Sequence, residues 1–264
     1  MHALHAAVDG MMRRIGRDVL LPRFRNLDAA EIEEKAPGDY VTVVDKESER
    51  QLSAALMALL PGSHVVGEEG VAADPALVDR ITDGLAWIVD PLDGTGNYTE
   101  GRTPFAMMVA LAEDGVVQAG WILDPVTQRM CHAMRGGGAY VDNRRIEAKP
   151  TRAALPVGAL ATRYLPDDVR ADITARAEGR ITIAEIPNCA GEQYPRLVLG
   201  TNDLALFWRT KPWDHAPGAL FVEEAGGRVA RPDGSTYRLG DERTGLLAAA
   251  SPELLDEAAT ILFG

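Results

Sequence analysis

The stretch WIVDPLDGTGNY, residues 87–98, decides the fold, because it combines a buried strand, two carboxylates and a sharp turn. The apolar run that precedes Asp90 predicts the strand. Asp90 and Asp93 flank a proline and a leucine at its end. Gly94 then permits a tight turn, and Thr95 begins a predicted helix. Two bare carboxylates at this spacing repel each other, so we expect a cation between them.

Hard oxygen ligands at this spacing suit Mg²⁺, which proteins usually hold with a few carboxylates, water and a substrate phosphate. Strand ends are common places for the sites of α/β folds. Backbone N–H groups at a helix start, such as the one predicted at Thr95, bind phosphate oxygens. The alternative is that Asp90 and Asp93, next to proline and glycine, are ordinary turn formers.

Around this stretch, residues 1–150 are predicted to form helices packed on an antiparallel sheet. Apolar residues at helical spacing predict a first helix that Pro22 ends, and residues 40–45 predict a short strand that runs into a second helix. Asp114-Gly115 and Asp142-Asn143 predict the turns of a meander.

Residues 151–264 alternate predicted strands and helices, which indicates an α/β layer arrangement. We find no linker or low-complexity segment between residues 1–150 and residues 151–264. The first half carries the candidate metal loops, and the second carries Asp214 and a candidate substrate pocket. We therefore expect one compact unit.

Composition excludes several classes of protein. The chain has 264 residues, with 39 acidic and 27 basic side chains and a formal net charge of -12. This charge disfavours binding to nucleic acid or anionic membranes. Cys131 and Cys189 predict reduced core thiols, and the five histidines show no zinc-like convergence. We find neither a signal peptide nor an apolar run of membrane-spanning length, so we expect a cytoplasmic protein.

Further acidic residues are candidate ligands or plain structural groups. Glu68 and Glu69, in GEEG (67–70), follow an apolar pair and are either ligands or a solvated loop. Asp45 and Asp214 each precede a predicted helix, so each is either a site residue or an N-cap. An N-cap and a metal ligand are compatible, since a carboxylate has two oxygens.

Taken together, these segments resemble the inositol monophosphatase family. WIVDPLDGTGNY fits its first signature, and WDHAPGALFVEEAGG (213–227) fits its second, with Pro217 where a small residue is usual. GEE and KAPGDYVTVVD (35–45) fall in the expected order. The resemblance covers nearly the whole chain and implies a layered α/β/α/β/α sandwich, a homodimer, and Mg²⁺-dependent, lithium-sensitive hydrolysis of phosphate monoesters.

The resemblance also implies roles for individual residues. Two or three Mg²⁺ ions would be held by Glu68, Asp90, the Leu92 carbonyl, Asp93 and Asp214. Asp45 and Thr95 would act as the catalytic pair that activates a water. The substrate would contact Asp93, Gly94, Thr95, Ala190, Gly191 and Glu192. Lys35 either approaches this site or is a solvated lysine. For a dianionic substrate, bound metals would reverse the local potential of this acidic chain.

We expect the substrate to be a small phosphorylated metabolite. One departure from the family pattern bears on its identity. Where relatives that act on inositol phosphate carry an acidic residue that bonds sugar hydroxyls, this chain has Phe207. Phe cannot accept those bonds. The candidate substrates are therefore inositol monophosphate or a related sugar phosphate and, as alternatives, histidinol phosphate, a nucleotide 3'-phosphate and fructose 1,6-bisphosphate. A non-catalytic regulatory member of the family is the alternative from another class.

Overall fold

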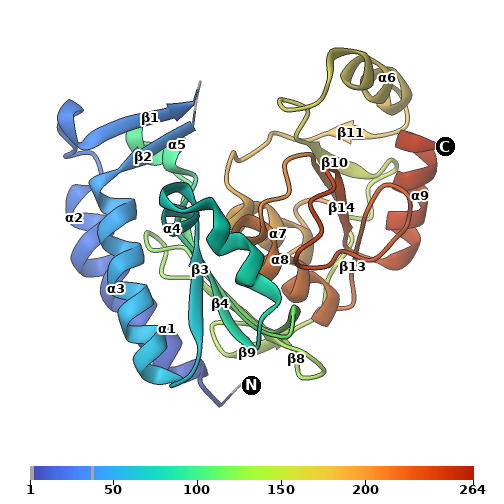
Figure 1. Cartoon of the computed structure of the whole chain (residues 1–264). Helices are drawn as coiled ribbons and strands as arrows, with labels where there is room; N and C mark the ends of the chain where they lie inside the picture. The colour runs from blue at the N-terminus through green and yellow to red at the C-terminus, as the bar shows by residue number, and fades with distance from the viewer. Residues whose placement is uncertain (1–2, 37–38) are drawn as a thin grey trace.

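A seven-stranded sheet forms the larger platform of the computed structural model, which describes residues 3–36 and 39–264 (Figure 1). Its strands lie in chain order from β3 to β9, with β3 and β4 parallel and every other pair antiparallel. They are β3 (His64–Gly67), β4 (Leu85–Asp93), β5 (Ala106–Glu113), β6 (Val116–Leu123), β7 (Met130–Met134), β8 (Gly138–Val141) and β9 (Arg144–Ile146).

The predicted turns of this meander are confirmed. Asp114 and Gly115 have φ values of 48° and 77°, and Asp142 and Asn143 have φ values of 48° and 64°. Positive φ at both central residues matches the right-handed twist of the paired strands, and it favours Asp, Asn and Gly at these positions. The one parallel pair, β3 with β4, is the departure from the predicted antiparallel sheet.

A second, five-stranded sheet has the strand order β11-β10-β12-β14-β13. The strands are β10 (Val157–Leu160), β11 (Thr182–Ile183), β12 (Leu204–Phe207), β13 (Arg228–Ala230) and β14 (Leu246–Ala249). β10 is parallel to β11 and β12, whereas β14 is antiparallel to β12 and β13. Strands β11 and β13 are short, with two and three residues. A two-stranded ribbon pairs β1 (Ile32–Ala36) with β2 (Asp39–Thr42).

Helices complete five layers, which confirms the predicted α/β/α/β/α sandwich (Figure 1). The first core cluster joins the large sheet to α1 (His5–Ile15) and α3 (Val43–Leu59). The second joins both sheets to α7 (Ala190–Val198) and α8 (Pro212–Glu224). The third joins the small sheet to α6 (Asp167–Ala177) and α9 (Pro252–Phe263).

Short helices connect these layers: α2 (Leu21–Arg23), α4 (Glu68–Ala73), α5 (Thr95–Thr99), a π-helical turn at Gly16–Leu20 and 3₁₀ segments at Ala29–Glu31 and Pro75–Thr82. Pro22 lies within α2 and does not end the first helix as predicted, because the wider π turn before it accommodates a residue without an N–H. None of the helices in the described part of the chain has the length and apolar character that crossing a bilayer requires.

The two halves of the chain share the middle core. Helix α8, from the second half, packs so closely on β6 of the first half that a Cβ on Gly120 would lie 2.8 Å from Pro217 Cα. Pro217 lies in the second turn of α8, because the helix begins at Pro212. The boundary at residue 150 stays a prediction, and the residues on both sides of it contribute to one core cluster.

Candidate active site

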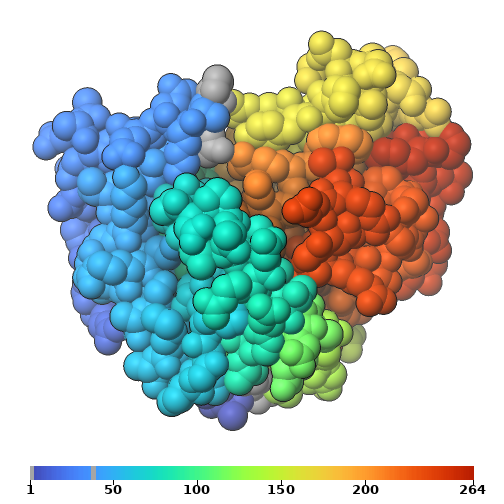
Figure 2. All heavy atoms as spheres, viewed as in Figure 1, coloured from blue at the N-terminus to red at the C-terminus, as the bar shows by residue number. Residues whose placement is uncertain are grey.

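A cavity of about 420 Å³ opens between the two halves of the chain. Figure 2 shows the surface hollowed between the teal segment around α4 and the orange segments of the second half. Its walls come from the end of β4 and the start of α5, from the segments after β10 and β12, and from the first turns of α7 and α8. Such a place, beyond the carboxyl ends of strands, is where α/β folds commonly bind ligands.

Three carboxylates from distant segments converge at this cavity. Ligand oxygens of Glu68, Asp90 and Asp214 all lie within 4.8 Å of one another. Glu68 is the first residue of α4, directly after β3, and Asp90 lies in β4. Because β3 and β4 are parallel with Gly67 opposite Val89, the next residues along, Glu68 and Asp90, come together. Asp214 reaches them from the first turn of α8.

Burial governs the electrostatics of this cluster. Asp90 is 2% exposed, and its burial, followed by the charges of Glu68, Asp93 and Asp214, raises its pKa well above the usual value. Burial, followed by the charge of Asp214, raises the pKa of Glu68 in the same way. Buried carboxylates that face one another ionise readily only when a cation joins them. Their hard oxygen atoms fit Mg²⁺, so the residues present suit the implied metal.

Lys35 does approach this cluster. It lies in β1, and its ammonium nitrogen is 2.7 Å from a carboxylate oxygen of Glu69 and 3.6 Å from one of Glu68. Of the GEEG pair, Glu68 therefore faces the other acids, whereas Glu69 pairs with Lys35. The residues between this lysine and Asp45 include Pro37 and Gly38, which lie outside the described residues.

Asp93 faces a different partner from the three converging carboxylates. Its Oδ2 accepts hydrogen bonds from the backbone N–H of Gly191 at 2.6 Å and from Cys189 Sγ at 3.0 Å. The register of β4 with β5 is irregular between Asp90 and Asp93, which turns the second carboxylate away from the regular ladder. Burial raises the pKa of Asp93, and these hydrogen bonds oppose that shift. Asp93 therefore ties the candidate metal loop to the start of α7.

Asp45 and Thr95 lie in hydrogen-bonding contact. Thr42 is the N-cap of α3, and Asp45 is its third residue, so the predicted N-cap position was three residues too late. One Asp45 oxygen accepts from the Thr42 backbone N–H and hydroxyl, at 2.8 and 2.6 Å, while the other lies 3.1 Å from Thr95 Oγ1. Burial raises the pKa of Asp45 to about 6.

The Thr95 hydroxyl also contacts the turn that carries Asp90. Thr95 Oγ1 lies 2.8 Å from the Leu92 carbonyl oxygen, and the Leu92 N–H donates to Asp90 Oδ1 at 2.9 Å. Gly94, the N-cap of α5, has a φ of 85°, and a Cβ there would lie 3.1 Å from the Pro104 carbonyl oxygen. A side chain at Gly94 would therefore be strained both in its backbone and by contact.

The three residues at the start of α7 that were expected to contact the substrate have different surroundings in the structure. Ala190 lines the cavity, and the Gly191 N–H is used by Asp93. Glu192 forms ion pairs with Arg129 and Arg196, so its carboxylate is bound within the protein. Nothing in the local sequence of Glu192 indicates Arg129, because that contact comes from the segment before β7.

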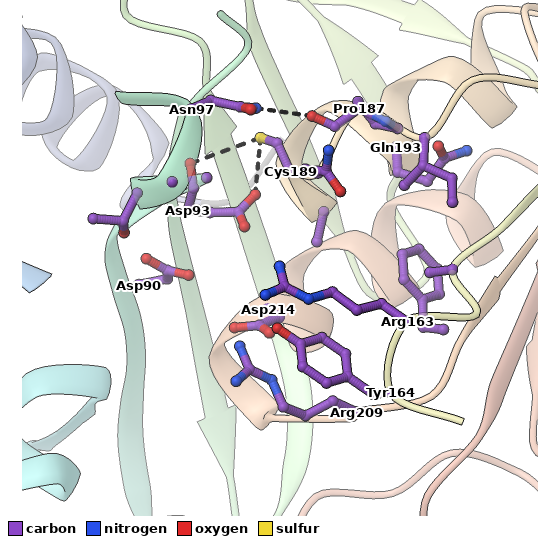
Figure 3. A pocket seen from close by; sticks show the side chains of 18 of the residues that line it. Asp90, Asp93, Asn97, Arg163, Tyr164, Pro187, Cys189, Gln193, Arg209 and Asp214 are labelled. Carbon is purple, nitrogen blue, oxygen red and sulfur yellow. Dashed lines mark hydrogen bonds between the residues drawn. The ribbon is translucent and has the colours of Figure 1, made fainter. Parts of the chain in front are cut away.

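Several cavity residues were missed in the sequence (Figure 3). They are Arg163, Tyr164, Gln193 and Arg209. Arg163 and Tyr164 follow β10, and Arg209 follows β12, so the rule that sites lie beyond strand ends would have found them. Phe207, where the resemblance led us to expect an acidic residue, also lines this cavity.

A five-layer sandwich with an acidic cluster beyond its strand ends defines the class of protein. The family model for the inositol monophosphatase family matches residues 6–262, and the chain belongs to that family. The chain is 31% identical over 262 residues to the putative Nus factor SuhB of Neisseria meningitidis serogroup B, which covers 95% of this chain and 94% of that protein. It is 29% identical over 210 residues to inositol-1-monophosphatase of Bacillus subtilis, or 76% of each chain.

Solved structures give the same result for the fold. The IMPase of Thermotoga maritima has a TM-score of 0.82 at 25% identity, covering 99% of this chain and 97% of that chain. Extragenic suppressor protein suhB from Bartonella henselae has a TM-score of 0.85 and 24% identity, with 99% of each chain covered.

Proposed function

We propose that this protein hydrolyses a small phosphate monoester in a reaction that depends on Mg²⁺. The observation that carries the proposal is the convergence of Glu68, Asp90 and Asp214 within 4.8 Å of one another at the edge of a cavity. A buried carboxylate that faces two half-buried ones is costly for folding alone, and a divalent cation would offset that cost. Membership of a family that includes inositol-1-monophosphatase supports the same reading.

The proposed ligands of two or three ions are Glu68, Asp90, the Leu92 carbonyl, Asp93 and Asp214. When bound, Mg²⁺ would lower the pKa of a water and neutralise charge that develops on the phosphate and the leaving group. The chain supplies the rest of the site. The hydrogen bonds from Gly191 and Cys189 hold Asp93 in place, and the Leu92 N–H orients Asp90.

We propose that Asp45 and Thr95 move the proton. The hydroxyl of Thr95 lies between Asp45 Oδ1 and the Leu92 carbonyl oxygen. Asp45, with a pKa of about 6, is matched to accept a proton near neutral pH. Its other oxygen is fixed by Thr42, so the carboxylate is held in one orientation. Attack by water on phosphorus then needs no covalent enzyme intermediate.

The backbone N–H groups of Gly94 and Thr95, at the sharp turn into α5, are the proposed contacts of the phosphate oxygens. Ala190 would contact the rest of the substrate. Because Phe207 offers no hydrogen bond, a bare polyol such as inositol monophosphate loses a partner that it needs. Histidinol phosphate, a nucleotide 3'-phosphate and fructose 1,6-bisphosphate remain candidate substrates of the same chemistry.

A regulatory role is the second candidate. Its support is the similarity to the putative Nus factor SuhB of Neisseria meningitidis, which extends over 95% of this chain. Retention of the three converging carboxylates favours the enzyme, since a purely regulatory protein needs no such cluster. A homodimer, inhibition by lithium and a cytoplasmic location belong to the enzyme proposal as family expectations.

Phosphate release from a panel of monoesters, with Mg²⁺ and after chelation, tests the proposal. The panel contains inositol 1-phosphate, histidinol phosphate, adenosine 3'-phosphate, fructose 1-phosphate and fructose 1,6-bisphosphate. We expect Mg²⁺-dependent release that lithium inhibits and that Asp90→Asn abolishes. Absence of release from every substrate by the folded, Mg²⁺-supplied protein would refute the enzyme and favour the regulatory role.

A further inference from the structure

Two arginines gather on the wall of the cavity that faces away from the α4 side. Arg163 and Tyr164 follow β10, and Arg209 follows β12. Because β10 and β12 are parallel neighbours, with Leu160 opposite Leu206, their carboxyl ends bring these residues together. The guanidinium carbons of Arg163 and Arg209 lie 5.5 and 4.9 Å from the centre of the Tyr164 ring. The ring thus holds both cations by cation–π contacts.

These side chains are directed into the site. Figure 3 shows Arg163, Tyr164 and Arg209 extending toward the side of the cavity on which Asp214 and Asp90 lie. The guanidinium of Arg163 has no hydrogen-bond or ion-pair partner among the described residues; its cation–π contact is to its own neighbour. In a chain of formal net charge -12, two cations that share one aromatic ring form a local positive region. Planar guanidinium groups match carboxylate and phosphate geometry.

A buried amide without a partner lies in the same cavity. Gln193, on α7, is 3% exposed, and neither its side-chain nitrogen nor its side-chain oxygen has a hydrogen-bond partner among the described residues. It lines the cavity together with the two arginines. Buried amides are costly when unpaired, which points to a ligand group that donates and accepts hydrogen bonds.

Two other residues of the wall offer no free hydrogen-bonding group to a polyol. Phe207 lines the cavity and stacks on Tyr194 with ring centroids 5.0 Å apart. His215, which also lines it, has both ring nitrogens engaged, with the Tyr194 hydroxyl at 2.7 Å and the Arg209 carbonyl oxygen at 3.0 Å. The polar side chains that line this cavity on the side of the second half include the two guanidinium groups and the Gln193 amide.

We propose that the leaving group of the substrate carries a second anionic group, a carboxylate or a phosphate, bound by Arg163 and Arg209, and a hydroxyl paired with Gln193. This inference rests on the proposed phosphatase function and narrows its substrate class. The scissile phosphate lies at the acidic, metal-binding side of the cavity, and the second anion lies at the arginine side. A substrate with two anionic groups thus has partners for one at the acidic, metal-binding cluster and for the other at the guanidinium groups that extend toward it.

Matched substrates test this inference. Glycerol 3-phosphate and 3-phosphoglycerate differ in a carboxylate, and fructose 1-phosphate and fructose 1,6-bisphosphate differ in a second phosphate. We expect kcat/KM, measured as phosphate release with saturating Mg²⁺, to be at least about tenfold higher for at least one of the two-anion members. The preference should shrink as salt is raised, since part of it is electrostatic. The matched pair of substrates that shows the higher kcat/KM identifies the second anion as a carboxylate or a phosphate.

Variants test whether the arginines of the cavity wall cause the preference for two-anion substrates. Arg163→Gln should reduce the two-anion preference by about tenfold, mainly through KM. Arg144→Gln makes the same charge change on exposed β9, outside the cavity lining, and should retain the preference. Gln193→Met should lower kcat/KM for hydroxylated substrates more than for a simple phosphate ester such as phenyl phosphate. Circular dichroism and thermal unfolding establish that each variant is folded.

Two results would overturn the inference while leaving the phosphatase function intact. One is equal kcat/KM within both matched pairs. The other is an Arg163→Gln variant that lowers turnover of one-anion and two-anion substrates by the same factor, since arginines that only neutralise the acidic cluster would do this. Absence of phosphate release from every compound is a separate outcome, because it refutes the proposed function itself.

Discussion

The carboxylate of Glu49, on α3, accepts a hydrogen bond at 2.8 Å from the backbone N–H of Glu69, at the start of α4. The Gly70 N–H donates to the other oxygen of the same carboxylate at 2.7 Å. Glu49 is 8% exposed, and burial raises its pKa. An acidic side chain at a helix N-terminus satisfies N–H groups that have no partner within the helix. Glu49 thereby positions α4, and with it Glu68, at the cavity.

Gly67→Ala should destabilise the protein and weaken Mg²⁺ binding. A Cβ at Gly67 would lie 2.4 Å from Glu49 Cδ, so either Glu49 or the start of α4 must move. We expect a loss of about 1–3 kcal/mol in the free energy of unfolding, measured with urea. Gly10→Ala is the control, because nothing lies within 4 Å of a Cβ at that helical position. It should stabilise the chain by up to about 1 kcal/mol. Equal behaviour of the two variants would contradict the Glu49 contact.

Asp90→Asn should stabilise the metal-free protein and remove its response to Mg²⁺. The substitution removes the buried carboxylate of the cluster, whose pKa is raised by burial and then by the charges of its acidic neighbours, while the Leu92 N–H keeps an oxygen acceptor. We expect a gain of about 1–3 kcal/mol without metal. Mg²⁺ at about 100 times its Kd should stabilise the wild type by about 2.7 kcal/mol.

Thermal unfolding measures both effects, since about 1 kcal/mol corresponds to a change of about 2–4 °C in Tm for a chain of this size. Chelation of metal should lower the Tm of the wild type and leave that of Asp90→Asn unchanged. If Mg²⁺ raised the Tm of both proteins equally, the proposed metal cluster would be wrong.

Thr95→Val should lower kcat by about 100-fold with little loss of stability, because the variant keeps the shape of the side chain and removes the hydroxyl that contacts Asp45. Thr95→Ser restores a hydroxyl and should recover most of the activity. Thr99→Val is a matched control on the same helix, because the Thr99 hydroxyl donates to the Gly96 carbonyl and Thr99 is not among the residues that line the cavity. A Thr95→Val enzyme with normal kcat would exclude the hydroxyl from the mechanism.

The pH profile should show an acidic limb set by Asp45. A general base acts when it is deprotonated, so activity should rise with pH through the pKa of this carboxyl, which burial raises to about 6. Bound cations favour the charged form, so the limb should lie no higher than about pH 6. Asp45→Asn should lose the limb together with about 100-fold or more in kcat. If the residual activity of Asp45→Asn still shows the acidic limb, the limb belongs to another titrating group.

His132 should make stability sensitive to acid. Its ring stacks on His5, with centroids 3.8 Å apart, and on Tyr140, at 4.9 Å. His5 Nδ1 accepts from Trp121 and its Nε2 contacts Asn143 Oδ1, and His132 Nε2 has no hydrogen-bond partner among the described residues. Burial, followed by the charge of His5, lowers the pKa of His132 from 6.5 to about 4.

Because the unfolded chain binds more protons than the folded chain between these two pKa values, stability from a neutral His132 is present above about pH 6.5 and is lost as pH falls toward 4. We expect the wild type to lose up to about 3 kcal/mol relative to His132→Phe over this range, measured by urea unfolding at each pH. The acidic cluster titrates in both proteins, so its contribution cancels in the difference between their free energies of unfolding. A difference that does not vary with pH would contradict the assignment.

Local sequence accounts for a large part of this fold. The Asp-Gly and Asp-Asn turns placed the hairpins of the large sheet, and apolar periodicity placed most of the helices, because each signal lies within a few neighbouring residues. The run from Trp87 to Tyr98 likewise combined a buried strand, a turn and a helix start. Errors concentrated where context decides. The helical run that starts at His5 passes through a π turn and ends at Arg23, one residue after Pro22, and the N-cap of α3 is Thr42, three residues before Asp45.

By itself, the sequence determined the family, the layered architecture and the acids that are candidate ligands, because those depend on residue types in a fixed order. Only the tertiary structure decided which side chains face one another. Packing of α8 brings Asp214 to Glu68 and Asp90, Arg129 pairs with the Glu192 carboxylate, and parallel β10 and β12 place Arg163 beside Arg209. Such distances join segments far apart in the chain, and they are set by close packing and strand register, which no local pattern of residues encodes.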